Sequence, residues 1–372
     1  TKTIRGNTAI LKRRINKQHI DMKRILYTLL SAIILTGCSE TSKSLMRSAV
    51  GNPYEVLVVC EPDFWEAPAG RALERVLDTD IPGLPQSERS FRISRVNELG
   101  NLTKPFRNII SVDINRNMYT KTTFKYAEDL FATPQVVLTI QSPTREDFEA
   151  YVTQNSQVIV DFLTAMEMNR QIENLKESHN FAANEAVKEM FGCELMIPAD
   201  MTGVKKGENF LWLSDFNSVN PEILSFVMYS YPYTSTDNFS LENFIHTRDS
   251  VLKINMPGGK PGQYMQTEKD YVTITETAHK ERYLQIARGL WYMENDMMGG
   301  PFVSHAVVDE LNNRVIVVEA FVYAAGQKKG RFIRKLEASL YTLKLPADKL
   351  IENSIYIPQI VIEAEDEAEN KQ

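Results

Sequence analysis

The chain has 372 residues, of which 42 are Lys or Arg and 48 are Asp or Glu, for a formal net charge of −6. Residues 38–372 alone carry 34 basic and 47 acidic residues, a net charge of −13. This excess of acid argues against binding to nucleic acid or to anionic lipid headgroups through bulk charge. The 335 residues of that part are enough for two ordinary domains.

Residues 22–39, MKRILYTLLSAIILTGCS, have the parts of a bacterial lipoprotein signal in order. Two basic residues precede an uncharged, mostly apolar run at residues 25–35, which is too short for a transmembrane helix of about 20 residues. The triplet Leu-Thr-Gly then precedes Cys38, whose thiol is the nucleophile that receives a diacylglyceryl group. We therefore expect Cys38 to be lipidated and to hold the protein to the membrane. The alternative is a signal-anchor helix with an incidental cysteine.

This signal divides the N-terminal part of the chain into three predicted segments. Residues 1–21 are interpreted as an upstream extension that is not part of the mature protein, with an unusually long basic leader as the alternative. Residues 22–37 are the predicted signal peptide. Residues 38–52 are predicted to be the lipidated cysteine and a polar, flexible tether.

Residues 53–192 are predicted to form a first α+β half. Apolar, β-branched or alternating runs predict strands at residues 54–60, 91–96, 108–114 and 135–140, and residues 63–77 are interpreted as a loop that leads into a short helix. A long helical pattern then starts with Ser142 as cap and Pro143 in the first turn. It extends to residue 191, with a bend near residues 178–180 and Gly192 as the stop.

Residues 193–346 are predicted to form a second α+β half, and residues 347–372 a C-terminal strand and an acidic tail. The patterns predict strands and helices in this order: strands at 193–197, 209–215 and 221–229, a helix at 237–254, strands at 271–277 and 283–293, a hairpin of 302–308 with 315–324, and a helix at 331–341.

The predicted fold class is therefore α+β, with mostly antiparallel sheets packed against a few long amphipathic helices. The order of strand, loop and helix occurs at residues 135–163 and again at 222–252, which suggests two similar halves. Chance recurrence of a common motif explains the same observation.

The sequence contains none of the common catalytic or phosphate-binding motifs, such as H-E-x-x-H, G-x-S-x-G or a Walker A loop. Four histidines follow Cys38, and they lie far apart, so we expect no metal, no cofactor and no catalytic residue of a known class. Cys60 and Cys193 lie in apolar runs and are interpreted as buried thiols, with a disulfide between them as the alternative.

Two short segments are candidate binding sites. The first, residues 61–66, combines Glu61 and Asp63 with Trp65, a mixture that could stack a sugar ring or provide a general acid and base. The alternative is the acidic N-terminus of a helix above a packed aromatic ring.

The second candidate, residues 288–301, contains Arg288, Trp291, Tyr292, Glu294 and Asp296 beside three methionines. Aromatic and Met side chains together could form an adaptable apolar surface for a ligand or partner. The alternative is a strand that leaves the core into a Gly-Gly-Pro turn, with the methionines filling gaps.

The opening NPYEVLVV, the lipobox and the block RGLWYMENDMMGGPFVSHAVVDELNNRVIVVEAFVYA resemble a Bacteroidetes lipoprotein family, domain of unknown function 4837, over residues 22–345. The resemblance implies a cell-envelope lipoprotein of a Gram-negative anaerobe, and it implies no catalytic residues. Surface export in such bacteria uses an acid-rich run after the lipidated cysteine, whereas only Ser39 and Glu40 stand there. The resemblance therefore favours the outer membrane with the body facing the periplasm.

Together these observations predict a non-enzymatic envelope lipoprotein that contacts the membrane through its lipid and binds a ligand or partner, such as an envelope protein or a glycan, but not nucleic acid. The alternative is an envelope hydrolase, for example one acting on glycans, that uses paired carboxylates: Glu61 with Asp63, or Glu294 with Asp296.

Overall fold

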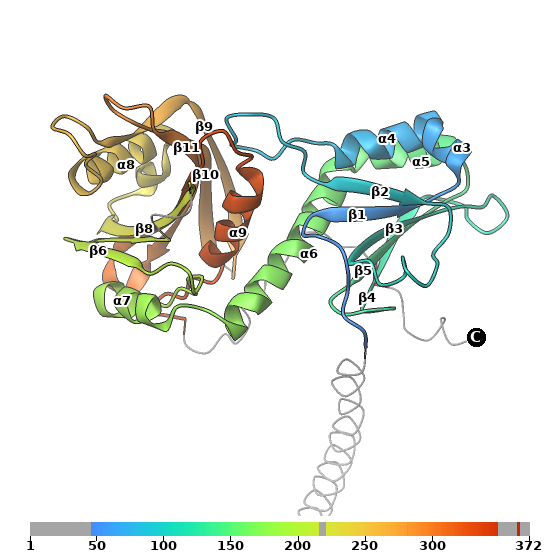
Figure 1. Ribbon diagram of the computed structural model, residues 1–372, viewed down its shortest axis with the longest axis horizontal. Coiled ribbons are helices and arrows are strands. Elements are labelled where there is room, and N and C mark those ends of the chain that lie inside the picture. Colours follow the sequence, from blue (N-terminus) through green and yellow to red (C-terminus); the bar gives the residue numbers. More distant parts are fainter. Residues whose placement is uncertain (1–45, 216–220, 281, 349–362, 365–372) are drawn as a thin grey trace, which may run out of the picture.

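The computed structural model describes residues 46–348, except residues 216–220 and 281, together with residues 363–364. The predicted signal peptide, Cys38 and most of the acidic tail lie outside the described residues. The described chain forms two sheets with a long helix between them (Figure 1).

The first sheet has six strands in the order β13-β4-β5-β3-β1-β2 and is mostly parallel. The strand β1 (Glu55–Val59) pairs in parallel with β2 (Arg92–Val96) and β3 (Asn108–Ile114), and β3 pairs in parallel with β5 (Val136–Ser142). The edge is completed by two further strands, antiparallel β4 (Thr123–Glu128) and the short β13 (Glu363–Ala364). The continuous apolar run of β1 suits a strand that is covered on both faces.

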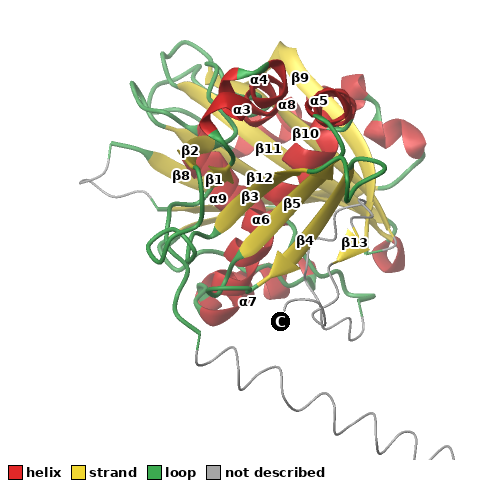
Figure 2. Ribbon diagram, turned by 90° about the vertical axis from the view of Figure 1, so that its right-hand side faces the viewer, coloured by secondary structure: helices red, strands yellow, loops and turns green. Residues whose placement is uncertain are grey.

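Three helices cover one face of the first sheet and lie together beside it (Figures 1 and 2). They are α3 (Pro62–Glu66), α4 (Pro68–Leu77) and α5 (Arg145–Gln154). Their buried side chains share one core with the inward-facing residues of the strands, including Phe64, Leu73 and Phe148. The opposite face is covered by smaller apolar contacts from the loops after β2 and β4.

The second sheet has seven strands in the order β6-β7-β8-β12-β11-β10-β9, and every pair in it is antiparallel. Its strands are β6 (Gly203–Gly207), β7 (Phe210–Ser214), β8 (Ile223–Pro232), β9 (Met265–His279), β10 (Arg282–Met293), β11 (Gly299–Asp309) and β12 (Arg314–Tyr323).

Helices cover both faces of the second sheet. On one face, α8 (Leu241–Asn255), which follows the short 3₁₀ helix η2 (Thr236–Phe239), packs on Trp291 and its neighbours. On the other face, α7 (Phe181–Phe191) and α9 (Gly330–Leu340) share a core with the alternate residues of the same strands. The hairpin between β11 and β12 turns through the 3₁₀ helix η3 (Glu310–Asn312).

The helix α6 (Ser156–Glu177) belongs to both cores. Ile159, Phe162 and Leu163 in its first half pack against the first sheet, whereas Ile172 and Leu175 near its end pack in the core of the second sheet. At 1.5 Å per residue, its 22 residues span about 33 Å, which is enough to connect the two layers.

The predicted α+β class is confirmed, and the second sheet has the antiparallel pairing that was expected. The parallel pairing of the first sheet was not anticipated, because strand direction depends on the crossover connections and not on the apolar pattern within a strand. The similarity of the two halves stays a prediction. The helix α7, which the predicted division at residue 192 assigns to the first half, packs with the second sheet.

Several local predictions need correction. Ser142 is the last residue of β5, and the cap of α5 is Thr144, whose hydroxyl accepts a hydrogen bond from the backbone of Asp147. Residues 193–197 do not form a strand, since Glu194 makes only an isolated bridge with Lys344. Gly192 does end α7, with a left-handed φ of 65° that favours glycine.

Part of the predicted tether is bound to the body of the protein. The backbone of Ala49 donates to the carbonyl of Thr133 at 2.9 Å, and that of Val50 donates to the carbonyl of Pro105 at 2.8 Å. These bonds satisfy backbone groups at the margin of the first sheet, so this body begins before residue 53.

Cys60 and Cys193 are both buried free thiols, as interpreted from the sequence. Burial raises the pKa of Cys193 to about 12. Among the described residues, no helix is both long enough and apolar enough to cross a bilayer.

Candidate functional site

A cavity of about 350 Å³ lies where the first sheet's domain meets the second. We call it the interdomain cleft. Three walls enclose it: the loop between α4 and β2, residues 157–168 of α6, and a wall formed by β10 and α9, of which α9 lies next to α6 (Figure 1). Its lining residues are Thr79, Asp80, Ile81, Pro82, Ser90, Gln157, Val160, Asp161, Thr164, Met168, Arg288, Arg334, Glu337 and Tyr341.

The loop between α4 and β2, residues 78–91, forms the first wall and is attached to the second domain. The carboxylate of Glu88 accepts hydrogen bonds from the backbone of Lys329 at 2.6 Å and of Gly330 at 3.1 Å. These donors begin α9 and have no partner within the helix, so Glu88 caps α9 from the other domain and complements the positive end of its dipole.

Arg334 makes a second connection across the same junction. Its guanidinium donates to the backbone carbonyl of Ser90 at 2.6 Å and lies 4.1 Å from the ring centre of Tyr54, in the geometry of a cation–π contact. The side chain is buried, and this burial lowers the pKa of Arg334. A buried cation whose donors already have acceptors holds the wall in place and is not available to a ligand.

The ion pair between Arg288 and Glu337 forms the wall of the cleft on the second sheet. The guanidinium contacts both carboxylate oxygens, with one bond of 3.0 Å, in the bidentate arrangement that fixes both side chains. Among the predicted site residues that the structure describes, Arg288 alone lines the cleft. It faces α9 because alternate residues of β10 point to opposite sides of the sheet.

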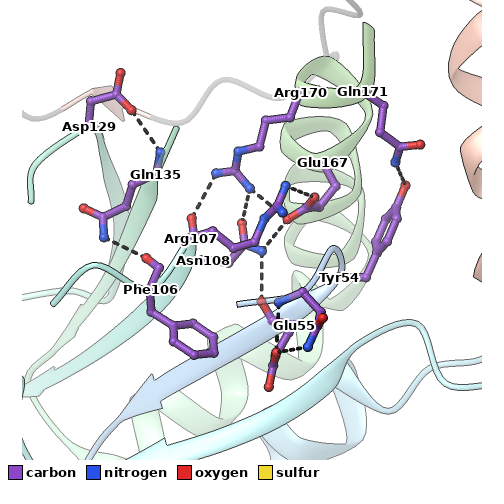
Figure 3. A network of polar contacts seen from close by, with 11 residues as sticks. Tyr54, Glu55, Phe106, Arg107, Asn108, Asp129, Gln135, Glu167, Arg170 and Gln171 are labelled. Atoms are coloured by element: carbon purple, nitrogen blue, oxygen red, sulfur yellow. Dashed lines mark hydrogen bonds and ion pairs between the residues drawn. The ribbon is translucent and has the colours of Figure 1, made fainter. Parts of the chain in front are cut away.

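The third wall, α6, is fixed to the first sheet by a buried polar network (Figure 3). The carboxylate of Glu167, which has no exposed surface, accepts hydrogen bonds from Arg107 at 2.8 Å, Arg170 at 2.8 Å and Asn108 at 2.6 Å. Asn108 also donates to the carbonyl of Glu55 and so joins α6 to β1 and β3. A buried network of this kind, in which the Glu167 carboxylate has three donors, sets one position of the helix along the sheet.

The interior and the rim of the cleft differ in character. Val160, Met168 and Tyr341 are buried and give the interior an apolar and aromatic surface. Asp80 and Asp161 lie in the exposed part of the lining. Asp161 accepts a hydrogen bond from Gln157 at 2.8 Å, and partial burial of its carboxyl group raises its pKa.

The first predicted site segment forms the helix α3, with its tryptophan inside. Trp65 is 2% exposed and lies under the guanidinium of Arg95, so its ring has no free face for a sugar. Glu61 and Asp63 are exposed and share Arg145, at 3.6 and 2.7 Å. The hydrogen bond from Arg145 lowers the pKa of Asp63, which is opposite to what a general acid needs.

The second predicted segment is split between the two faces of the second sheet. Trp291 is 2% exposed, donates its indole N–H to the carbonyl of Val322 and packs under α8, on the face opposite Arg288. The neighbouring Tyr292 is partly exposed and, by alternation along the strand, points to the other side. The expected surface of joined aromatic rings is therefore not formed.

Glu294 and Asp296 lie in the turn after β10 and have local partners. Glu294 accepts a hydrogen bond from Gln266 at 2.9 Å, and Asp296 accepts one from Gln263 at 2.9 Å and others from the backbone of the turn. Met297 beside them is fully exposed. The arrangement is that of a stabilised turn, and among the described residues no group of three or more His, Cys, Asp or Glu side chains could hold a metal.

Sequence reasoning did not identify most of the cleft. Gln157, Asp161 and Thr164 recur at intervals of four and three on α6, so a polar stripe on a helix was visible in the sequence. The residues of the other walls, such as Ser90 and those of α9, are far away along the chain, and no local pattern connects them with this stripe.

Comparison with known proteins identifies both domains and the N-terminal signal. Residues 180–342 match the family model described as Domain of unknown function (DUF4837), and residues 49–176 match the model described as Domain of unknown function (DUF8532). Residues 22–39 match the prokaryotic membrane lipoprotein lipid attachment site. The break between the two domain matches falls between α6 and α7.

The chain matches no curated protein. It is similar to a solved structure from Bacteroides thetaiotaomicron VPI-5482 at 9% identity and a TM-score of 0.19, over 42% of this chain and 46% of that one. The chain thus spans less than half of that protein. The match at residues 180–342 confirms the resemblance to the DUF4837 family for that part of the chain, whereas residues 49–176 match the separate DUF8532 model. The lipid attachment site shows that the chain is a lipid-anchored protein of the cell envelope.

Proposed function

We propose that this lipoprotein is a binding module whose ligand occupies the interdomain cleft. The observation that carries the proposal is a cavity of about 350 Å³ with walls from both domains and with buried charges that already have partners. Ligand sites of about 300 to 1,000 Å³ occur preferentially at such junctions. A small envelope ligand, such as a glycan fragment, or the side chains of an extended partner would fit this volume.

Binding is supported over hydrolysis by the placement of the candidate carboxylates. Glu61 and Asp63 share one arginine at the surface of the first domain, whereas Glu294 and Asp296 each have a separate hydrogen-bond partner in a turn of the second. A glycosidase needs two carboxyl groups that face one another across the substrate, one of them able to donate a proton.

The proposal is tested with a substitution that fills the cleft and leaves the core residues unchanged. Thr164 is partly exposed on α6 and lines the cavity, so Thr164→Trp should fill it. Native mass spectrometry of the protein after incubation with an envelope extract should show bound species with the wild type and lose them with Thr164→Trp. Thr153→Trp, an exposed position on α5 away from the cavity, is the matched control. Retention of the same species by Thr164→Trp would contradict the proposal.

We also propose that the lipid places the protein in the outer membrane with its domains facing the periplasm. Support comes from the sequence after Cys38, which begins Ser-Glu and has no run of acidic residues. An external protease should leave the protein intact on whole cells and digest it after the outer membrane is opened. The Cys38→Ala variant should lose both its lipid label and its membrane fractionation, and membrane retention without the label would refute the anchor.

A further inference from the structure

We infer that the interdomain cleft takes an organic cation, namely a primary ammonium group on an aliphatic stem, as in an alkylamine or a lysine side chain. This inference rests on the proposed function and names the class of ligand for the same cavity. It follows from which charges of the lining already have partners and from where the apolar surface lies.

The two cations of the lining are already occupied by groups of the protein. Arg288 contacts both carboxylate oxygens of Glu337, and Arg334 donates to the carbonyl and hydroxyl oxygens of Ser90. An anionic ligand would have to replace these partners, and it would leave the carboxylate of Glu337 unpaired in a buried site. The lining therefore disfavours phosphates and carboxylates.

The two acidic side chains at the rim, Asp80 and Asp161, have no cationic partner among the described residues. The carboxylate of Asp80 accepts a hydrogen bond from the Ser87 hydroxyl, at 2.6 Å, and that of Asp161 accepts one from the Gln157 amide. Within the described part of the chain, neither carboxylate forms an ion pair with Lys or Arg. The lining as a whole has three acidic side chains, Asp80, Asp161 and Glu337, and two basic ones, Arg288 and Arg334.

The interior of the cleft suits the other end of such a ligand. Val160, Met168 and Tyr341 are buried side chains that contribute apolar and aromatic surface to the lining. An aliphatic stem would remove this surface from water, and the Met side chain adapts to stems of different shape.

The experiment compares pentylamine with pentan-1-ol, which has the same stem and no charge. Saturation-transfer NMR titrations use the full chain with Cys38→Ala, since that change leaves every described residue intact. The amine should bind more tightly than the alcohol at pH 7.5. Asp161→Asn should weaken amine binding about tenfold, the expected effect of losing one charge contact in a partly screened site, and should leave alcohol binding unchanged.

Asp270→Asn is the matched control, because Asp270 is an exposed aspartate on β9 outside the cleft. The thermal midpoints of all variants establish that each is folded. Equal binding of amine and alcohol, no binding of the amine, or an Asp161→Asn variant that binds the amine as the wild type does would overturn the inference.

These outcomes separate the inference from the proposed function. If Thr164→Trp removes an envelope ligand while pentylamine shows no preference over pentan-1-ol, the cleft is a binding site but its ligand is not a cation. If Thr164→Trp changes neither the binding of the envelope ligand nor the binding of pentylamine, both the site and its ligand class are wrong.

Discussion

The ion pair between Arg248 and Glu319 allows a quantitative test of what holds the second domain together. Both side chains have no exposed surface and lie between α8 and the centre of the sheet. The guanidinium of Arg248 donates to Glu319 at 2.9 and 2.7 Å and to the hydroxyl of Thr267 at 2.8 Å. It also lies 4.0 Å from the ring centre of Phe302. Every charged group of this cluster therefore depends on the others.

Replacing Arg248 with Met should lower the free energy of unfolding by about 3 to 5 kcal/mol, because Glu319 would remain buried without its cation. The double variant Arg248→Met/Glu319→Leu should recover most of this loss, since a buried pair replaced by apolar side chains of similar volume is close to neutral. The large single effect and the small double effect together would identify the cause as the unpaired carboxylate.

Urea denaturation followed by tryptophan fluorescence gives these free energies, with Trp291 reporting from the same core. Arg116→Met, at an exposed position, is the control and should change the stability by less than about 0.5 kcal/mol. A loss below about 1 kcal/mol for Arg248→Met, or a double variant as unstable as the single one, would refute this reasoning.

Three further predictions concern the domain junction, acid stability and the thiols. Glu88→Gln should speed hydrogen exchange in the loop of residues 78–91 and destabilise the start of α9 by about 1 kcal/mol, and unchanged exchange there would contradict the interdomain cap. Burial lowers the pKa of His279 to about 4, so the stability it contributes is complete above its unfolded value of about 6.5 and is lost as the pH falls toward 4, by about 2 to 3 kcal/mol. His279→Phe should flatten this acid slope in thermal melts, whereas His246→Phe at an exposed position should not. In the Cys38→Ala variant, Cys60 and Cys193 should react with a thiol reagent only at the rate of unfolding, because both are buried, and rapid labelling of the folded protein would refute their burial.

Local patterns predicted the elements that carry their own signals. The run at residues 108–114 is β3 with the expected bounds, and the predicted hairpin is formed by β11 and β12. Alternation along β10 also contained the information that Trp291 and Tyr292 face opposite sides, although composition alone suggested one aromatic surface. The alternation of side chains along the strand, read together with its aromatic content, therefore predicts the position of each ring better than the aromatic content alone.

The helix α6 shows what local patterns could not give. Its apolar pattern was part of one long helical prediction, residues 142–191, within the first α+β half, but the first half of α6 packs against one sheet and its end against the other. Which neighbour covers each apolar residue depends on the arrangement of both sheets. The parallel direction of the first sheet has the same origin, since it is decided by crossovers and not by the strands themselves.

The sequence by itself determined the lipid anchor and the α+β class. The anchor is recognised as a short linear signal around Cys38, and the class follows from the order and period of apolar runs, so neither depends on distant residues. Only the tertiary structure determined where the cleft lies and which residues line it. Glu88 meets the start of α9 across 241 positions of sequence, and Arg334 meets Ser90 across 244. Contacts of this range form only when both domains pack on α6, and no pattern in either segment encodes them alone.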